Sequence, residues 1–327
     1  MPRISAIDPI GPAWNRMVLI LFKPFQFKKW LLLGFCAFLA QCGEGGGQAP
    51  GPDPGNPGGR GRGQDGVGEW FEENMALVVL IAIAAFLLVV GVALLVTWLN
   101  SRGKFMLIDG IVKNRGAVSE PWREYRAEAN SLFLFRVCYG LLAFAAAALI
   151  VLLGLAIASS DISDEKFGGA ATAGLLIGGS LMLLWMLLLV VISFFLRVFV
   201  VPTMYLKRVR VMEGWRVAWS ELGRNHVGSI LLFFLMLMIL GITAGVVGIF
   251  IFCLTCCLVT IPYVGSVICL PIIVFFEAYV LEYIQQHGGG WRFFPRACMG
   301  CGYDLKGHGE TGVCPECGKC LQDVAAG

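Results

Sequence analysis

Four cysteines near the C-terminus have the spacing of a metal site. They form two CxxC pairs, each followed by Gly, and 12 residues separate Cys301 of the first pair from Cys314 of the second. Two such pairs can place four thiolates tetrahedrally around one zinc ion. The Gly after each pair allows the backbone to turn tightly beside the metal. The sequence therefore predicts a zinc ribbon with four ligands, Cys298, Cys301, Cys314 and Cys317.

The predicted ribbon would be structural rather than catalytic, because four protein ligands leave zinc no open position for water. A tail of about 25 residues cannot bury a core of its own, so metal binding would largely drive its folding. After Arg296, two lysines oppose four acidic residues. Such a surface has no basic patch, so we expect a protein partner and no nucleic acid. His308 and Cys320 are further donors that the site does not require.

The composition of the whole chain indicates a membrane protein. Of 327 residues, 57% are hydrophobic and only 14% are charged, whereas soluble domains carry about 25% charged residues. The formal net charge of +3 is too small to suggest nucleic-acid binding. We therefore expect the elements that position the tail to be helices in a lipid bilayer.

Five apolar runs reach the roughly 20 residues that a membrane-spanning helix needs. Unbroken runs of this length favour helices over barrel strands. The runs are Met75–Leu99, Arg136–Ala158, Ala171–Leu196, Gly228–Phe252 and Val259–Leu281. A sixth run, Trp30–Gln41, is shorter, and it spans a bilayer only if Lys28 and Lys29 reach for the headgroups and the helix extends at both ends. A re-entrant or interfacial segment is the alternative for this run.

The distribution of basic residues indicates an orientation. Residues 100–131 and 197–226 hold six Lys and Arg each, and the first 29 residues hold five. Residues 43–74 instead hold two Arg against six acidic residues, and residues 160–170 hold one Lys against three. Because cytoplasmic loops are enriched in Lys and Arg, six spans with both termini in the cytoplasm satisfy every loop. We therefore expect a multi-pass protein of the cell inner (plasma) membrane. The cytoplasm around the predicted tail would keep its thiols reduced, which favours zinc over disulfides.

The two long basic loops also resemble each other. A Phe is followed 15 to 17 residues later by Trp-Arg in three places, namely Phe105–Trp122, Phe199–Trp215 and Phe276–Trp291. This spacing predicts a repeated unit made of a Trp-bearing interfacial helix, a helix out and a helix back. The alternative is that Trp, Arg and Lys gather at every membrane interface. Gly174-xxx-Gly178 and Gly241-xxx-Gly245 would let such helices approach closely.

These observations predict an all-α transmembrane fold, a six-helix bundle of three helical hairpins with amphipathic interfacial helices, plus a small C-terminal zinc ribbon. Residues 1–42 would hold an N-terminal interfacial helix and the first span. Residues 43–74 would be an extracytoplasmic linker, because residues 43–68 contain 12 Gly and 4 Pro. Residues 75–285 would form a five-span membrane domain, and residues 286–327 the cytoplasmic ribbon tail.

Two acidic residues lie on the predicted last span. Glu277 and Glu282 stand towards its cytoplasmic end. An ionisable group at membrane depth is a functional hypothesis, but both carboxylates can also reach the headgroup level and pair there with Arg. Pro262 and Pro271 are expected to kink this helix and could line a cavity. The sequence contains no catalytic triad, nucleotide-binding loop or catalytic carboxylate pair, so we expect no catalytic residues and no enzyme activity.

Other cysteines cluster at predicted outer helix ends. Cys253, Cys256 and Cys257 close the fifth span, and Cys42 closes the first. A redox pair or disulfide in an oxidising compartment is one interpretation. Buried apolar thiols are the interpretation that residue statistics favour.

Two regions resemble known families. The tail, CxxCGYDLxGx followed by CPECG over Cys298–Lys319, is similar to short zinc-ribbon modules appended to many bacterial proteins. The membrane part, roughly residues 10–285, resembles uncharacterised bacterial six-helix proteins through its Trp-bearing amphipathic segments such as Phe199–Gly228. Those proteins are distantly similar to the membrane domain attached to some glycerophosphoryl diester phosphodiesterases. The resemblance implies no phosphodiesterase activity, since no catalytic domain of that kind is present.

The function expected from these patterns is that of a non-enzymatic integral membrane protein whose cytoplasmic zinc ribbon binds a protein partner. The alternative is a transporter or lipid-handling protein that uses a cavity between helical hairpins, with Glu277 and the kinked last helix at that cavity. An intramembrane enzyme is a third possibility with less support.

Overall fold

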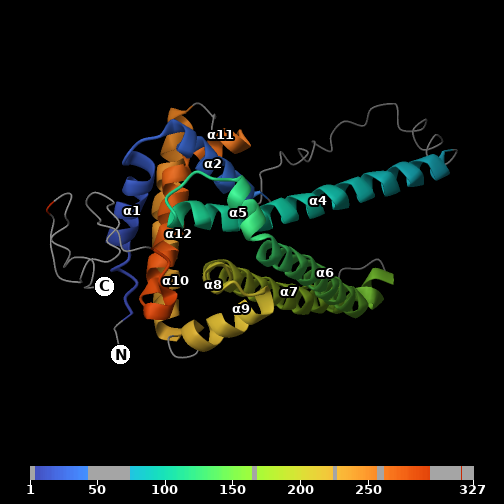
Figure 1. Ribbon diagram of the computed structural model, residues 1–327. Helices are drawn as coiled ribbons and strands as arrows, with labels where there is room; N and C mark the ends of the chain where they lie inside the picture. The colour runs from blue at the N-terminus through green and yellow to red at the C-terminus, as the bar shows by residue number, and fades with distance from the viewer. Residues whose placement is uncertain are drawn as a thin grey trace.

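The structure is a computed structural model that describes residues 4–42, 74–163, 168–223, 227–255 and 261–294, together with Gly318. The regular secondary structure of these residues is helical, with no strand among them (Figure 1). This confirms the predicted all-helical class for the part of the chain that the structure describes.

Four helices in the described residues are long and apolar enough to cross a membrane. They are α4 (Met75–Val112), α6 (Arg126–Ser163), α7 (Gly169–Phe195) and α10 (Val227–Leu254). Their apolar side chains are mostly exposed, from Leu77 at the start of α4 to Phe250 near the end of α10. Apolar surface of this extent suits a lipid environment and not water.

Helix α7 continues beyond its predicted end through a change of helical type. A π-helical segment, η1 (Leu196–Val200), follows α7 and leads directly into α8 (Val201–Lys207). Pro202 lies in the first turn of α8 and cannot donate a backbone hydrogen bond to the preceding turn. A π-turn before the proline accommodates the missing bond without ending the helix.

The remaining helices are short. They are α1 (Ile10–Phe22), α2 (Phe27–Gln41), α5 (Ser119–Glu124), α9 (Val211–Val217), η2 (Ala218–Gly223), α11 (Pro262–Ile268), α12 (Leu270–Gln285) and η4 (Gly289–Trp291). Several of them pack around the C-terminal third of α4. Residues 100–112 of α4 are all buried there, whereas most of residues 75–95 are exposed.

The six expected spans therefore appear as four long helices and two shorter segments. The first predicted span lies in α2, which has only 15 residues. The last, Val259–Leu281, is two helices in the described residues, with Cys269 between α11 and α12. Pro262 and Pro271 stand in the first turns of these helices, where a missing N–H costs least. The prolines thus begin new helices, whereas the sequence predicted that they would kink a single one.

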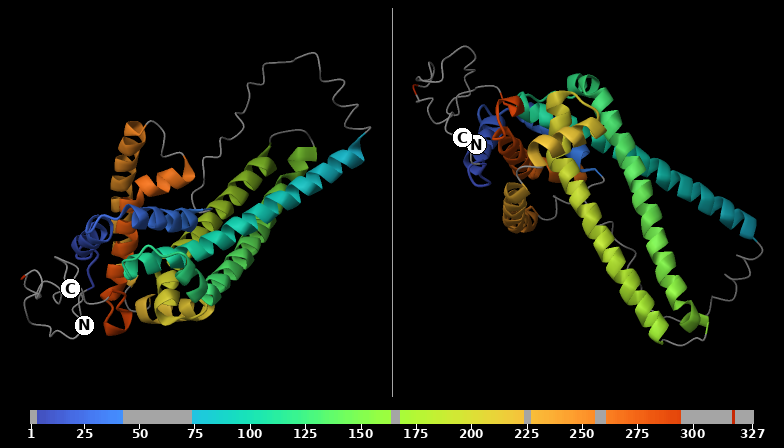
Figure 2. Two further views of the ribbon diagram at one scale, coloured as in Figure 1. Left: turned by 45° about the horizontal axis from the view of Figure 1, so that its top comes forward. Right: turned by 90° about the horizontal axis from the view of Figure 1, so that it is seen from below.

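Glycines let α6 and α7 approach closely. A Cβ on Gly174 of α7 would lie 2.6 Å from the carbonyl oxygen of Gly154 on α6, and one on Gly178 would lie 3.4 Å from the Cα of Gly154. The predicted close approach at Gly174-xxx-Gly178 is therefore confirmed, and α6 and α7 lie side by side as a hairpin (Figure 2). Gly241 and Gly245 of α10 have no atom within 4 Å of a Cβ position. Helix α10 runs across the direction of α6 and α7.

Helix α2 lies antiparallel to the end of α4. A Cβ on Gly103 would lie 2.5 Å from the backbone nitrogen of Ala40, and one on Gly110 would lie 2.6 Å from Leu33 Cδ2. The amide of Asn100 adds a 2.6 Å hydrogen bond to the carbonyl oxygen of Ala40. Small residues on α4 thus allow α2 to pack against its backbone.

The predicted repeat is visible in the backbone of the first two units. Asn114 and Arg208 have φ values of 52° and 55°, and each stands nine residues after a fully buried Phe, Phe105 or Phe199. Both residues end a long helix, and a short Trp-bearing helix, α5 or α9, follows each. Positive φ is uncommon outside glycine, so its recurrence at one register supports a structural repeat.

The third unit has the same register with a different first residue. Gly288, with φ of 119°, stands nine residues after the buried Tyr279. His287 precedes Gly288 as Lys113 and Lys207 precede the positive-φ residues of the other units. The unit therefore begins at Tyr279, three residues after the Phe276 that the sequence suggested.

Candidate functional site

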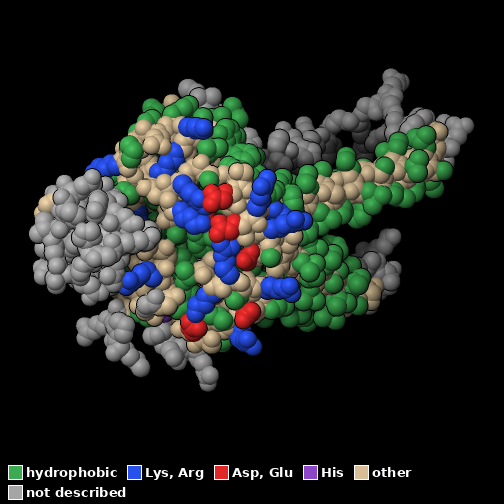
Figure 3. Space-filling view, in the orientation of Figure 1, with side chains coloured by type: hydrophobic (Ala, Val, Ile, Leu, Met, Phe, Trp, Pro, Cys, Tyr) green, Lys and Arg blue, Asp and Glu red, His purple; other side chains and the backbone are tan. Residues whose placement is uncertain are grey.

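Charged side chains gather over the end of the molecule where the short helices pack, beside the hydrophobic surfaces of the long helices (Figure 3). The centre of this region is Asp109, which lies on the buried end of α4 and is only 1% exposed. A buried carboxylate is costly unless charged and hydrogen-bonding partners compensate for the lost water.

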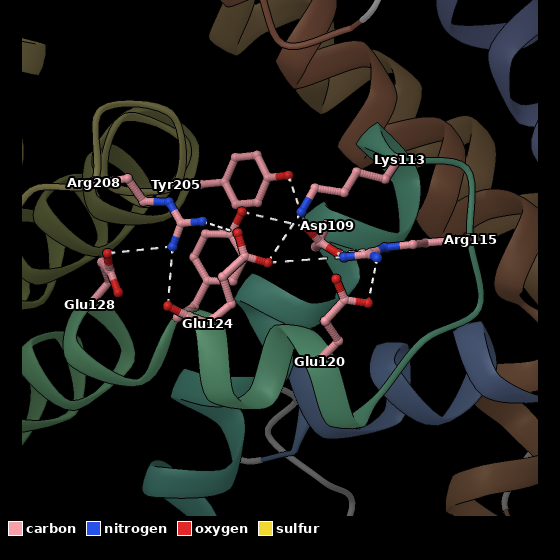
Figure 4. Close-up of polar contacts among 9 residues, drawn as sticks. Asp109, Lys113, Arg115, Glu120, Glu124, Glu128, Tyr205 and Arg208 are labelled. Atoms are coloured by element: carbon pink, nitrogen blue, oxygen red, sulfur yellow. Dashed lines mark hydrogen bonds and ion pairs between the residues drawn. The ribbon is translucent and has the colours of Figure 1, made fainter.

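Two cations and two hydroxyls surround the Asp109 carboxylate (Figure 4). Lys113 Nζ lies 2.7 Å from Oδ1, and Arg115 donates to Oδ2 through Nη2 at 2.9 Å and Nε at 3.2 Å. The hydroxyls of Tyr205 and Tyr125 lie 3.2 Å and 3.4 Å from Oδ1. Both carboxylate oxygens are therefore engaged by groups of the protein, and the carboxylate joins α4, α8 and the junction of α5 with α6.

A second ring of acids holds the cations in place. Arg115 Nη1 donates to Glu120 at 2.6 Å, and Lys113 Nζ donates to Glu124 at 3.2 Å. Glu124 also accepts from Arg208, which ends α8. The guanidinium of Arg208 stands 3.8 Å from the ring centre of Tyr125, within cation–π range. Alternating charges thus connect the first repeated unit to the second.

The residues bound to Asp109 and their acidic partners form one charged network, namely Asp109, Lys113, Arg115, Glu120, Glu124, Tyr125, Tyr205 and Arg208. The pKa values of three members that lie outside the long helices are shifted. The hydrogen bond with Glu120 raises the pKa of the Arg115 guanidinium, with Asp109 adding to the rise. Burial would lower the pKa of Lys113, but its hydrogen bond with Asp109 and their opposite charges outweigh burial and raise it. Burial raises the pKa of Tyr125. The cations therefore stay charged and the tyrosine neutral at physiological pH.

Arg102 forms a separate buried site about two helical turns before Asp109 on α4. Its guanidinium carbon lies 4.6 Å from the ring centres of both Trp98 and Trp122. It also donates to the backbone oxygen of Trp122 at 3.2 Å and to Asn130 Oδ1 at 3.2 Å. Trp122, which the repeat singled out, therefore packs against a buried cation.

The acids of the predicted last span both have cationic partners. Glu282 is buried on α12 and accepts from Arg16 of α1. Glu277 lies 3.9 Å from Arg197, whose side chain is half exposed. Pairing with Arg, the simpler of the two interpretations of these acids, is therefore what the structure contains.

The predicted zinc ligands lie outside the described residues, as do His308 and Cys320. Within the part of the chain that the structure describes, no cluster of His, Cys, Asp or Glu could hold a metal ion. Gly318, which follows the last predicted ligand, is described and has φ of 67°. Glycine adopts this left-handed conformation readily, and the zinc site itself stays a prediction.

The other cysteine prediction has a mixed outcome. Cys256 and Cys257 lie outside the described residues. Cys253 and Cys42 are free thiols, so neither forms a disulfide. Cys253 is exposed on the apolar helix α10 and Cys42 is partly buried, so neither thiol is enclosed by protein side chains.

Sequence reasoning missed Asp109, Arg102 and Tyr205. It counted Arg102 as one more basic loop residue, although an Asp within the apolar segment Phe105–Val112 was a visible signal for a buried carboxylate. A shallow, open depression of about 550 Å³ adjoins the network and is lined by Ser119, Glu120, Arg123 and Glu124. Its lining residues all belong to α5, whereas the transporter alternative places its cavity between helical hairpins.

The described residues are helical throughout their regular secondary structure, and four of their helices are long and apolar enough to cross a membrane, which suits a helical membrane protein. The chain belongs to a family of unknown function, DUF7544, which matches residues 4–289. No curated protein and no solved structure matches it. The resemblance to the phosphodiesterase-associated membrane domain and to appended zinc ribbons stays a prediction.

Proposed function

We propose that this protein is a non-enzymatic multi-pass membrane protein that presents a zinc ribbon at its cytoplasmic face for binding by a partner protein. The observation that carries the proposal is the docking of the chain just before the tail. Trp291, Phe293 and Phe294 are buried, and the backbone N–H groups of the two Phe donate to Gln285 Oε1 at 3.2 Å and 3.4 Å. Arg16 stacks 3.6 Å over the ring of Phe294.

This docking means that the tail leaves the membrane domain from a fixed place. Three residues separate Phe294 from the first predicted zinc ligand, so the ribbon would lie near α1 and α12. A rigid exit point supports a presenting role, because it lowers the entropy that a partner must remove on binding.

The ribbon is tested by metal content. The purified full-length protein should hold close to one zinc per chain, and Cys298→Ser with Cys314→Ser should abolish this zinc. Cys138→Ser with Cys269→Ser, which changes two free thiols of the membrane domain, is the matched control and should keep it. Zinc that persists in the first variant would overturn the assignment. Partner binding is tested by cross-linking in cells, which should capture the same partner from wild type and control and lose it in the first variant.

We also propose six crossings with both termini cytoplasmic. Four crossings alone, with residues 100–131 and 197–226 in the cytoplasm, would leave the basic N-terminus and the tail outside. Two further crossings, by α2 and by α11 with α12, return both to the cytoplasm. Residues 43–73 are polar and rich in Gly and Pro and cannot cross lipid. Their two ends must therefore lie on one side of the membrane.

This topology sets a requirement on the depth of α4. Because α2 lies beside residues 103–110 of α4, it crosses the bilayer only if those residues lie at bilayer depth and the cytoplasmic loop begins at about Lys113. Residues 75–110 measure about 53 Å along the helix, so α4 must then tilt strongly in a hydrocarbon core of about 30 Å. A reporter fused at Gly58 should be extracytoplasmic, and one fused after Gly327 should be cytoplasmic. A cytoplasmic reporter at Gly58, or an extracytoplasmic one after Gly327, would contradict six crossings while leaving the zinc content of the protein intact.

A further inference from the structure

The corner between α1 and α2 combines exposed aromatic rings with lysines. It comprises Phe22–Lys29, with the sequence FKPFQFKK, which holds three Lys and no acid. Phe22, Phe25 and Phe27 are 46%, 58% and 64% exposed. Lys23 and Lys28 are exposed beside them. Three neighbouring Phe side chains facing water would be unfavourable, so this corner needs an apolar neighbour.

The corner is held in one conformation. The rings of Phe22 and Phe25 pack 5.4 Å and 5.5 Å from Trp30, whose Nε1 donates to the carbonyl oxygen of Val267 at 3.0 Å. Lys29 Nζ donates to the carbonyl oxygen of Ile20 at 2.7 Å and to Asn114 Oδ1 at 2.6 Å. Lys29 is thus engaged within the protein, whereas Lys23 and Lys28 are available to an external partner.

The contact with Asn114 shows where the corner lies. Asn114 follows the buried end of α4, next to the charged network, so the corner stands at the same end of the molecule. At a membrane interface, aromatic rings favour the boundary between headgroups and acyl chains, and each Lys is attracted to anionic lipid. Charge complementarity therefore selects an anionic headgroup over a zwitterionic one.

We propose that the corner Phe22–Lys29 binds anionic phospholipid, with its three Phe rings among the upper acyl chains and Lys23 and Lys28 on the headgroup phosphate. The inference rests on the proposed membrane insertion, with this end of the molecule in the cytoplasm. It adds a lipid class and a defined site to the general bilayer environment.

The test uses full-length protein in lipid nanodiscs that contain phosphatidylglycerol and phosphatidylcholine in equal amounts. Native mass spectrometry counts the lipids of each class that remain bound after release. Lys23→Gln with Lys28→Gln should lower the preference for phosphatidylglycerol by roughly thirty-fold, the effect expected of two lysines near an anionic surface. Phe25→Ser with Phe27→Ser should lower the retention of both lipids, because the rings contact acyl chains of either class.

The matched control removes two charges from another exposed place. Arg123→Gln with Arg126→Gln has the same charge change on α5 and α6, away from exposed aromatic rings, and should keep the wild-type preference. An unchanged preference in the lysine variant, or an equal loss in the control, would overturn the proposal. Nanodiscs present phosphatidylglycerol on both leaflets, so a reversed topology or a missing zinc would leave this result unaffected.

Discussion

The hydroxyl of Tyr205 lies 3.2 Å from the carboxylate of Asp109, although 96 residues separate them in the chain. Tyr205 belongs to α8 of the second repeated unit and Asp109 to the end of α4 in the first. The ring of Tyr205 also stacks 4.9 Å from that of Tyr125. This pair therefore couples the two units at their shared end, where the long helices meet the charged network.

Removing the Asp109 carboxylate should be strongly destabilising. Asp109→Ala removes the buried anionic partner of Lys113 and Arg115. We therefore expect a loss of about 3–5 kcal/mol in the free energy of unfolding. Tyr205→Phe removes one hydrogen bond to a charged acceptor and should cost about 1.5–3 kcal/mol. Titration with SDS in mixed micelles measures both losses.

Tyr263→Phe provides the control for the tyrosine substitution. The Tyr263 hydroxyl donates to the neutral carbonyl oxygen of Leu31 at 3.1 Å, so its removal should cost only about 0.5–1.5 kcal/mol. Equal losses for Tyr205→Phe and Tyr263→Phe would contradict a special role of the Asp109 charge.

Stability should fall at alkaline pH. The pKa values of Lys113 and Tyr125 are raised above their ordinary values, so both groups hold a proton more tightly in the folded protein than in the unfolded chain. Their contribution is complete below about pH 10, and it is lost as pH rises through the folded pKa values. Thermal unfolding in detergent from neutral to strongly alkaline pH measures this. In Asp109→Asn the decline should be shallower, and a wild-type slope there would count against the network as its cause.

The glycines of α7 and α10 should differ in tolerance. Gly174→Ala places a Cβ 2.6 Å from the carbonyl oxygen of Gly154, so α6 and α7 must separate, at a cost of about 1–3 kcal/mol. Gly241→Ala meets no atom within 4 Å and should be neutral or slightly stabilising. The same micelle titration compares the two variants. Similar losses would indicate that another chain covers Gly241.

The acids of α12 should also behave differently. Glu282→Gln leaves Arg16 without its buried partner and should cost about 3 kcal/mol, with loosening of α1 from α12. Glu277→Gln breaks a longer, partly exposed contact and should cost at most about 1 kcal/mol. Limited proteolysis near the N-terminus would detect the release of α1. Rapid cleavage in the Glu277 variant alone would reverse the assigned roles.

Glu277→Gln also addresses the transporter alternative. If Glu277 only pairs with Arg197 near the headgroups, the variant should leave growth and solute flux unchanged. A clear loss of flux with an intact fold would favour transport over the presenting role proposed above.

The sequence by itself determined the helical membrane class, the approximate positions of the four long helices and the register of the first two repeated units. These properties are local, since a run of about 20 apolar residues or a repeated Phe-to-Trp interval is legible without knowledge of neighbours. The same locality makes the two CxxC pairs a specific prediction, because their ligands are supplied by one short segment.

Only the tertiary structure decided which polar residues are internal. Asp109 and Arg102 look in the sequence like residues at the edge of a basic loop, yet both are buried, because α2, α5, α6 and α8 cover the end of α4. The division of the last predicted span at Cys269 and the pairing of Arg16 with Glu282 likewise depend on contacts between distant segments. Burial and ion pairing depend on which helices pack together, and the lengths of the apolar runs do not reveal this packing.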